Sequence, residues 1–392
     1  MNLFSEGSRR WYKSIIGMSA SLVTPWLIDY AYRKLYSSGD ANPELHKVPT
    51  RDGIEVALWH YSPNGNGDEP VLFVHGLGAN HRNMALNEEN GLVQYMVQKG
   101  YDCWAIDLRG RGGSDTPNGS WCFDDYAKKD LPATLDYILE ETGYDKLHWV
   151  GHSMGGMLYY AVAGALDHQE KIASATTMAS PFGMQEPLLV NRLALFLNRI
   201  ARAADTMPLT QFLNLRLKDL PGYLKEYDVP LHRLPQAYMI RWVGFFLILF
   251  KRFLPQDFIL AYMNPNQVDD ATIRKGVNEV VERMSFRELN QFADWVLNDR
   301  WTDEDQVIDY AKGVPNLRVP TLMIGGAEDR MTPAHHLKWG FKAMDTDDKK
   351  FVLAGEDTGF EDDYAHVDIV LGKNARDEIF PIIYDWIRKH PI

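Results

Sequence analysis

The sequence predicts an α/β fold in which helices flank a mostly parallel sheet and a helical insertion interrupts the chain. Short apolar segments alternate with helical segments along residues 41–180, a pattern typical of parallel strands joined by helices. The same pattern returns over residues 316–392. Between them, residues 181–315 contain long apolar helical runs and no strand signal. We therefore divide the chain into an apolar, amphipathic helical segment at residues 1–40, a core in two parts and an inserted helical cap.

Composition limits the classes of function. The chain has 392 residues, of which 45% are hydrophobic, so it can bury one large core in addition to an insertion. Its net charge of −12 argues against nucleic acid as a partner and against a basic membrane-binding patch. The two cysteines, Cys103 and Cys122, are too few for a disulfide framework, and no cysteine–histidine cluster has zinc-ligand spacing. We expect neither a metal nor a cofactor, and the oligomeric state stays open.

The N-terminal segment has three interpretations. Arg9, Arg10 and Lys13 precede an apolar stretch at residues 15–28, which is too short to span a bilayer. Residues 1–36 form an amphipathic helix on the protein or a membrane surface, a helix packed in the domain, or a leader. We expect a cytoplasmic protein, with peripheral membrane contact through this segment and a cleaved leader as the alternatives.

The elements follow in order along the chain. In the first half, short apolar runs predict strands at residues 45–49, 54–61, 71–74, 102–106, 146–150 and 172–178, with helices at about 86–99 and 124–141. The glycine-rich segment 107–115 lacks the lysine and the spacing of a phosphate-binding loop, so it is expected to be a turn. In the second half, strands at 320–325 and 350–353 precede a helix at about 374–389.

A serine between glycines is the main functional signal. Gly151-His152-Ser153-Met154-Gly155 joins the apolar strand at 146–150 to a helix of small and apolar residues. A strand-to-helix turn this tight strains the serine backbone, and the glycines let strand and helix approach closely. The turn exposes the hydroxyl and directs the helix N-terminus at the reacting oxygen. Ser153 is therefore the predicted nucleophile, and a structural helix start is the alternative.

An acid and a base follow in the chain order that such a nucleophile requires. Asp329 comes directly after the strand at 320–325, and His366 lies between the last strand and the final helix. Because the carboxyl ends of parallel strands meet at one edge of a sheet, we expect both residues near Ser153. Asp329 could instead cap a helix, with Glu328 as the alternative acid.

The oxyanion needs two N–H donors, and two loops offer them. One is the N–H of Met154, the residue after the nucleophile, and the other is the N–H of Leu77 in the glycine-containing loop after the strand at 71–74. His75 in that loop is expected to anchor it more than to act as a base. The expected substrate-binding residues are His75, Gly76 and Gly78 of the loop, with Trp242, Phe245 and Phe246 of the cap.

With these motifs in order, the chain resembles the α/β-hydrolases over nearly its whole length. Residues 123–156, from F-D-D-Y to H-S-M-G-G, and the H-G-L loop at 75 resemble the acid lipases, although those relatives usually carry Gln where Met154 stands. Residues 264–310, with N-Q-F-A-D-W-V, are similar to polyhydroxyalkanoate synthases and depolymerases. The synthases use a cysteine nucleophile, and epoxide hydrolases and dehalogenases an aspartate, so Ser153 favours hydrolysis of an ester.

The predicted function is hydrolysis of a hydrophobic carboxylic ester through an acyl-enzyme, without cofactor or metal. The apolar cap favours a medium or long acyl chain over a polar substrate. Other uses of the same three residues stay open: carbon–carbon bond hydrolysis, thioester hydrolysis, polyhydroxyalkanoate depolymerisation or acyl transfer. A hydrolase-fold protein that only binds its ligand is a further alternative.

Overall fold

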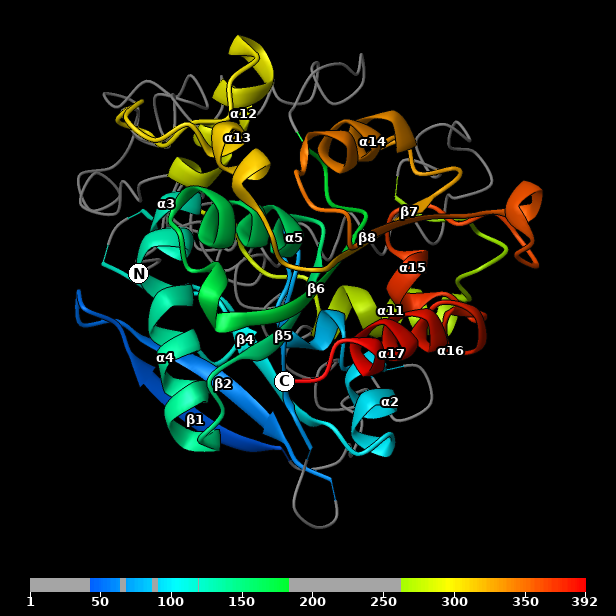
Figure 1. Cartoon of the computed structure of the whole chain (residues 1–392), viewed down its shortest axis with the longest axis horizontal. Helices are drawn as coiled ribbons and strands as arrows, with labels where there is room; N and C mark the ends of the chain where they lie inside the picture. Colours follow the sequence, from blue (N-terminus) through cyan, green and yellow to red (C-terminus); the bar gives the residue numbers. More distant parts are fainter. Residues whose placement is uncertain (1–42, 64–67, 87–90, 119, 183–261) are drawn as a thin grey trace, which may run out of the picture.

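The computed structural model describes residues 43–63, 68–86, 91–118, 120–182 and 262–392 (Figure 1). The predicted N-terminal segment and most of the predicted cap lie outside the described residues, and with them the predicted pocket residues Trp242, Phe245 and Phe246. The described segments form a sheet covered by helices. None of the described helices is both long enough and apolar enough to cross a membrane.

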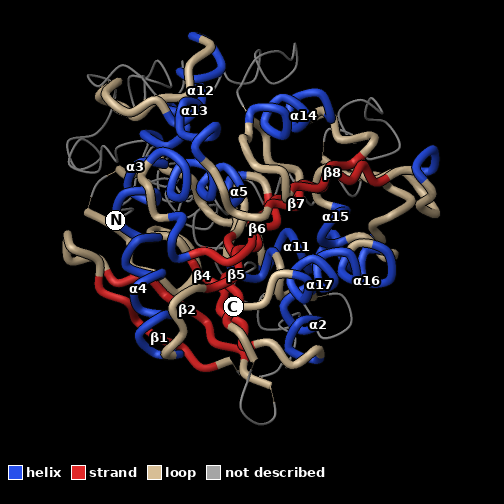
Figure 2. The backbone as a smooth tube through the Cα atoms, viewed as in Figure 1, coloured by secondary structure: helices blue, strands red, loops and turns tan. Residues whose placement is uncertain are grey.

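Eight strands form one sheet, which crosses the molecule as a twisted band (Figure 2). They are β1 Glu44–Pro49, β2 Glu55–Tyr61, β3 Pro70–Val74, β4 Asp102–Asp107, β5 Leu147–His152, β6 Ile172–Met178, β7 Thr321–Gly326 and β8 Lys349–Ala354. Their order is β1-β2-β4-β3-β5-β6-β7-β8. Strand β2 pairs antiparallel with β1 and β4, and all other pairs are parallel. The predicted α/β class with a mostly parallel sheet is therefore confirmed.

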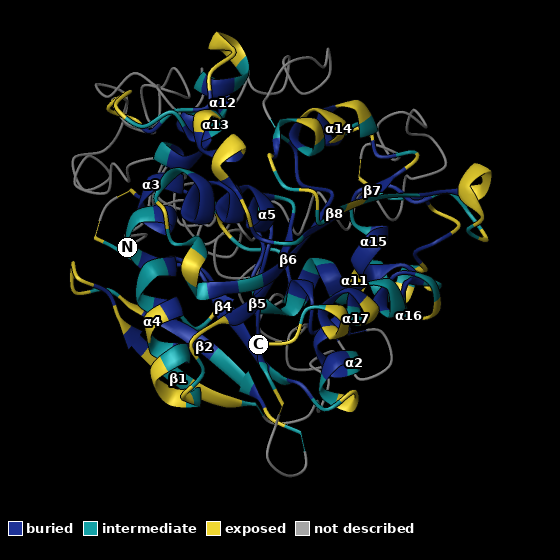
Figure 3. Cartoon of the chain, viewed as in Figure 1, coloured by how far each residue is buried: buried dark blue, intermediate teal, exposed yellow. Residues whose placement is uncertain are grey.

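Alternate residues of the central strands enter two different cores. Leu72 and Val74 of β3 belong to one cluster, whereas Val71 and Phe73 belong to the other, as the two-residue period of a strand requires. The first face is covered by α3 Phe123–Asp125, α4 Leu131–Thr142, α5 Met154–Tyr159, α12 Phe286–Asn298, α13 Tyr310–Gly313 and α14 Ala334–Ala343. The second is covered by α2 Leu92–Gln98, α11 Asp270–Glu279, α15 Asp368–Leu371, α16 Ala375–Glu378 and α17 Phe380–Lys389. Figure 3 shows the buried sheet centre and the exposed outer strand β1.

Two predicted helices differ in their bounds. The helix expected from about residue 86 begins only at Leu92, because Gly91 before it has extended backbone. The single helix expected at 374–389 is divided into α16 and α17. Pro381 in the first turn of α17 has no N–H to bond a carbonyl of the preceding turn, so a continuous helix is interrupted there. The segment 107–115 is a turn, as predicted, with positive φ at Gly110 and Gly112.

The described part of the predicted cap is helical and attached to the core. Over residues 262–315, helices α11, α12 and α13 occur with a single isolated bridge, Thr302 to Asp309. A fully buried ion pair joins Arg111, after β4, to Glu288 of α12, with 2.6 Å between the charged atoms. The hydroxyl of Tyr126 donates to the same carboxylate at 2.9 Å. Helix α12 is therefore held on the carboxyl side of the sheet.

Candidate active site

Ser153 lies on the tight turn between β5 and α5, with φ of 51° and ψ of −115°. A residue other than glycine held at such angles stores about 1–3 kcal/mol of strain. The turn is fixed by its own backbone: the Ser153 N–H donates to Met178 O of β6 at 2.8 Å, and its carbonyl accepts from Gly156 N–H at 3.0 Å. A Cβ on Gly155 would overlap the Val74 carbonyl. The glycine is therefore required for helix α5 to pack against β3.

The structure brings Ser153, Asp329 and His366 together at the carboxyl edge of the sheet. His366 Nε2 lies 3.0 Å from Ser153 Oγ, and His366 Nδ1 lies 2.9 Å from Asp329 Oδ2. A carboxylate can only accept, so Nδ1 carries the proton and Nε2 presents its lone pair to the hydroxyl. Both Asp329 and His366 are buried. This is the arrangement in which a base removes a proton from a nucleophile.

Asp329 is held by a turn of its own loop. Its Oδ1 accepts from the N–H groups of Met331 at 2.9 Å and Thr332 at 2.7 Å, and its Oδ2 accepts from the Thr332 hydroxyl. Three donors therefore fix the carboxylate while Oδ2 also receives His366 Nδ1–H. Thr332 was not predicted from the sequence. An aspartate followed three residues later by a threonine, the spacing of a side-chain-capped turn, is the signal that could have found it.

The two alternatives for the acid can now be compared. Asp329 does accept backbone N–H groups as a cap would, but helix α14 begins only after Pro333. Glu328 forms an ion pair with Arg330 at 3.2 Å and is partly exposed. No hydrogen bond joins Glu328 to His366 among the described residues, so Asp329 is the acid that the geometry favours.

His152, next to the serine, connects two loops of the site. Its Nε2 lies 3.1 Å from the His366 carbonyl oxygen, and its Nδ1 lies 3.0 Å from Asn83 Oδ1. The same Asn83 oxygen accepts the Gly76 N–H at 3.2 Å. Burial lowers the pKa of His152 to about 3, so the ring is neutral. A neutral ring carries one N–H and both facing atoms are acceptors, so it donates to one of these two oxygens and only packs against the other.

Asp368 holds the histidine loop from the other side. Its Oδ2 accepts from the Ala365 N–H at 2.8 Å and from the Asn264 N–H at 2.7 Å. Burial raises the pKa of Asp368 to about 7, against the opposing effect of these two N–H groups. The Val367 N–H donates to Tyr262 O at 3.0 Å. The chain that leaves the cap region is thus attached directly to the loop that carries His366. Sequence reasoning missed this contact, because it joins residues about a hundred positions apart.

The two predicted oxyanion donors belong to segments that adjoin Ser153. Met154 is the first residue of α5, where an N–H has no partner within the helix, and its side chain is buried in the core. Gly76 touches the serine: a Cβ placed on it would come 3.2 Å from Ser153 Cβ. Leu77 follows directly. Among the described residues, neither the Leu77 N–H nor the Met154 N–H donates to another group. The oxyanion role of these two N–H groups stays a prediction.

The other loop residues have structural partners. His75 Nε2 accepts the Leu108 N–H at 3.2 Å and Nδ1 lies 2.8 Å from Gly76 O, while burial lowers its pKa to about 4. His75 thus anchors the loop, and this arrangement does not favour a direct polar contact to substrate. Gly78 has φ of 65°, and its carbonyl accepts from Glu282 N–H at 2.8 Å. The segment after α11 therefore covers this loop.

Comparisons with known proteins show the family of the fold. The sequence profile of the alpha/beta hydrolase fold matches residues 69–361. Gastric triacylglycerol lipase of Bos taurus is 34% identical over 171 residues, which are 39% of this chain and 43% of that lipase. The lysosomal acid lipase/cholesteryl ester hydrolase of Rattus norvegicus is 25% identical over 320 residues, covering 72% of this chain and 75% of that enzyme. The chain thus spans less than half of the gastric lipase in this match.

Solved structures share the fold at low sequence identity. A soluble variant of monoglyceride lipase from Saccharomyces cerevisiae superposes with a TM-score of 0.58 and 15% identity, covering 91% of this chain and 98% of that one. An esterase from Thermogutta terrifontis gives a TM-score of 0.52 and 17% identity, covering 89% and 100%. These likenesses concern the arrangement of sheet and helices.

Proposed function

Because the chain belongs to the alpha/beta hydrolase fold family, we propose that it is a serine hydrolase that cleaves hydrophobic carboxylic esters through an acyl-enzyme. The observation that carries the proposal is the position of His366, hydrogen-bonded at once to the hydroxyl of Ser153 and to the carboxylate of Asp329. The named activities of its lipase relatives support ester hydrolysis as the reaction class.

In this proposal Ser153 Oγ attacks the ester carbonyl carbon while His366 Nε2 accepts the hydroxyl proton. The tetrahedral intermediate collapses when the histidine returns this proton to the leaving alcohol, and Ser153 keeps the acyl group. A water molecule, deprotonated by His366, then attacks the acyl-enzyme in the same way. The carboxylic acid is released and Ser153 regains its proton. Asp329 orients the imidazole and stabilises its positive form throughout.

The N–H groups of Leu77 and Met154 would bind the oxyanion of each tetrahedral intermediate. A preorganised donor of this kind lowers the barrier by about 3–4 kcal/mol. Met154 suits the role because the donor is its backbone N–H, whereas its side chain is packed in the core. The side chain at this position therefore does not decide whether an oxyanion can be held.

We propose a hydrophobic acyl chain of medium or long length as the substrate. The relatives named above act on triacylglycerols and cholesteryl esters, and the chain itself carries long apolar runs between residues 181 and 315. With p-nitrophenyl acetate, octanoate and palmitate, kcat/KM should be lowest for acetate. A higher kcat/KM for acetate than for both longer esters would exclude this substrate class. Product analysis with an added alcohol separates hydrolysis from acyl transfer.

The nucleophile is tested by covalent labelling. A fluorophosphonate probe should form one adduct, which mass spectrometry of peptides locates at Ser153. Labelling should disappear in Ser153→Ala and slow strongly in His366→Ala. Ser62→Ala is the matched control, because this exposed serine follows β2 and touches none of the proposed machinery. An adduct elsewhere, or none in the folded protein, would favour the alternative of a protein that only binds its ligand.

A further inference from the structure

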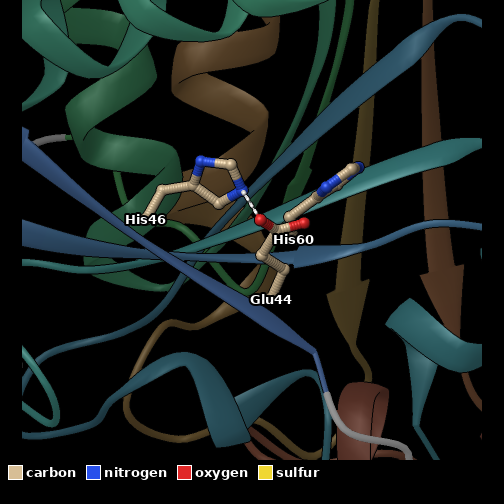
Figure 4. Close-up of side chains that lie close together, drawn as sticks. All are labelled: Glu44, His46 and His60. Atoms are coloured by element: carbon tan, nitrogen blue, oxygen red, sulfur yellow. Dashed lines mark ion pairs between the residues drawn. The ribbon is translucent and has the colours of Figure 1, made fainter.

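Two histidines and a glutamate come together on the outer hairpin, at the end of the sheet order opposite to β8. Glu44 of β1 lies directly across from His60 of β2 in the antiparallel register, and His46 lies two residues along β1, on the same face as Glu44. One ring nitrogen from each histidine and a carboxylate oxygen of Glu44 all lie within 4.8 Å of one another (Figure 4). We propose that these three side chains bind a divalent cation of borderline softness, Zn²⁺ being the best match.

The ring of His60 is fixed by a carboxylate. Its Nε2 lies 2.6 Å from Asp102 Oδ1, and because a carboxylate only accepts, Nε2 carries the proton and the lone pair is on Nδ1. Trp104 fixes the carboxylate in turn by donating its Nε1–H to Asp102 Oδ2 at 2.7 Å. It also stacks on the imidazole, with ring centroids 3.9 Å apart. Metal-binding histidines are typically oriented in this way by a carboxylate on the second nitrogen.

The two ring nitrogens of His46 differ in their hydrogen bonding. Nδ1 lies 2.8 Å from the hydroxyl of Tyr137 on α4, which can accept a hydrogen bond from it. Its Nε2 is buried, forms no hydrogen bond with any described residue and lies 3.9 Å from Glu44 Oε1. A buried nitrogen without a partner costs free energy, and a cation placed between the three side chains would satisfy it.

The distances and charges suit a small cation. Ligand atoms around tetrahedral Zn²⁺ are about 3.3 Å apart, so the three ligand atoms need only move slightly closer together. The side chain of Glu44 is 75% exposed and is therefore free to move toward the two histidines. Two neutral imidazoles and one carboxylate leave a position for water. The ion pairs recorded for Glu44 and Asp102 are with the two histidines, so no lysine or arginine of the described chain is seen to occupy the place of a cation.

A second group of possible ligands does not support the same inference. Cys122, Asp124 and Glu304 also lie close together, but Arg287 already forms an ion pair with Glu304. Burial also raises the pKa of the Cys122 thiol, which opposes the thiolate that a metal would require. The proposed hairpin site differs from the expectation from sequence that the chain binds no metal. No spacing motif in the sequence indicates this site, because only the pairing of β1 with β2 brings residues 46 and 60 together.

The test is direct titration of the full chain with Zn²⁺. Bound metal is first removed with a chelator, and the chelator is then removed. We expect one site per chain by calorimetry, and visible absorption of Co²⁺ typical of tetrahedral coordination. His46→Ala and His60→Ala should abolish the site, and Glu44→Gln should weaken it at least tenfold. Asp102→Asn should weaken binding by about ten- to a hundredfold, because it only orients a ligand. His335→Ala, a histidine of α14 outside the cluster, is the matched control.

Folding of each variant is checked by fluorophosphonate labelling, which reports on the distant Ser153 and should be unchanged. Glu44→Gln changes an exposed side chain and keeps the test valid if a histidine variant fails to fold. Zn²⁺ binding that is as tight in Glu44→Gln and in His46→Ala as in the wild-type chain would overturn the proposal. So would the absence of any saturable Zn²⁺ or Co²⁺ site in the wild-type chain.

Discussion

At the scale of single residues, the proposed chemistry depends on groups that hold Asp329 and His366 in place. The hydroxyl of Thr332 donates to Asp329 Oδ2, the oxygen that also faces His366 Nδ1. The side chain of Asp368 holds the backbone of the histidine loop by accepting the Ala365 N–H. Neither residue needs to touch the substrate, so each is a positioning residue. Their effects should appear in the rate of reaction with Ser153 and in its pH dependence.

Thr332→Val removes one hydrogen bond to a carboxylate and leaves the two backbone donors. Because a hydrogen bond to a charged group contributes about 1.5–3 kcal/mol, kcat/KM should fall roughly ten- to a hundredfold. The rate of fluorophosphonate labelling should fall in parallel. Thr332→Ser restores the hydroxyl and should recover most of the activity. Equal activity of the valine and serine variants would show that the hydroxyl does not position Asp329.

Asp368→Asn should change how stability depends on pH. In the unfolded chain the carboxyl loses its proton near its ordinary pKa of about 3.9, whereas in the folded chain the pKa is raised to about 7. Between these values the folded state binds more protons. The free energy of unfolding of the wild type should therefore fall as pH rises through this window, and level off above it.

The asparagine keeps an oxygen for the two N–H donors and does not titrate. From pH 4 to 7 the free energy of unfolding of the wild type should therefore fall, relative to that of Asp368→Asn, by on the order of 4 kcal/mol, at about 1.4 kcal/mol per pKa unit. Urea unfolding at several pH values measures this difference. A constant difference between the two proteins across the window would mean that Asp368 does not bind a proton in the folded state.

Residue by residue, the sequence predicted what local context determines. Ser153, Asp329 and His366 were predicted because each follows a strand, and the structure places them within hydrogen-bonding reach. The contact of His152 with the His366 carbonyl was missed. It depends on how loops more than two hundred residues apart meet, and nothing in the pattern near residue 152 specifies that.

At the scale of elements, the attachment of helix α12 to the loop after β4 can be tested. Glu288 of α12 and Arg111 form an ion pair in which both side chains are fully buried. Two nitrogens of Arg111, Nε and Nη1, have no hydrogen-bond partner in the part of the chain that the structure describes. A buried charge that is only partly satisfied gives little net stabilisation, but removing its one counter-charge is costly.

Glu288→Ala should therefore lower the free energy of unfolding by about 3–5 kcal/mol. The double variant Arg111→Met with Glu288→Leu should be less destabilised than Glu288→Ala alone, because no charge is left buried. Denaturant unfolding of Arg111→Met, of Glu288→Leu and of the double variant that combines them gives the coupling energy of the pair. Additive losses would show that the two side chains do not depend on each other.

The strands could be predicted closely, and their order could not. Buried parallel strands are apolar on both faces, so β3 appears in the sequence as a continuous apolar run and β7 as a nearly continuous one. Nothing in those runs states that β4 lies between β2 and β3. The predicted helix bounds were wrong where a single residue determines them, at Gly91 before α2 and at Pro381 in α17.

At the scale of the whole molecule, the excess of acidic residues should affect stability. The net charge is −12, and charges of one sign repel one another in the compact state. Salt screens exposed charges more than about 10 Å apart at about 0.1 M, whereas buried pairs such as Arg111–Glu288 are little affected. Raising NaCl from about 10 to 150 mM should therefore raise the melting temperature by a few degrees. A lower melting temperature in salt would mean that surface ion pairs outweigh the repulsion.

The two outer strands of the sheet determine how the folded chain meets its own copies. β1 and β8 each leave one row of backbone N–H and C=O groups unpaired within the sheet, which is a template for aggregation. Charged residues mark both strands: Lys47 is exposed on β1, and Lys349 and Lys350 begin β8. Pro49 ends β1 without a donor. Exposed lysines and a terminal proline oppose strand-to-strand growth at these two edges, so the folded protein should resist fibril formation even at high concentration.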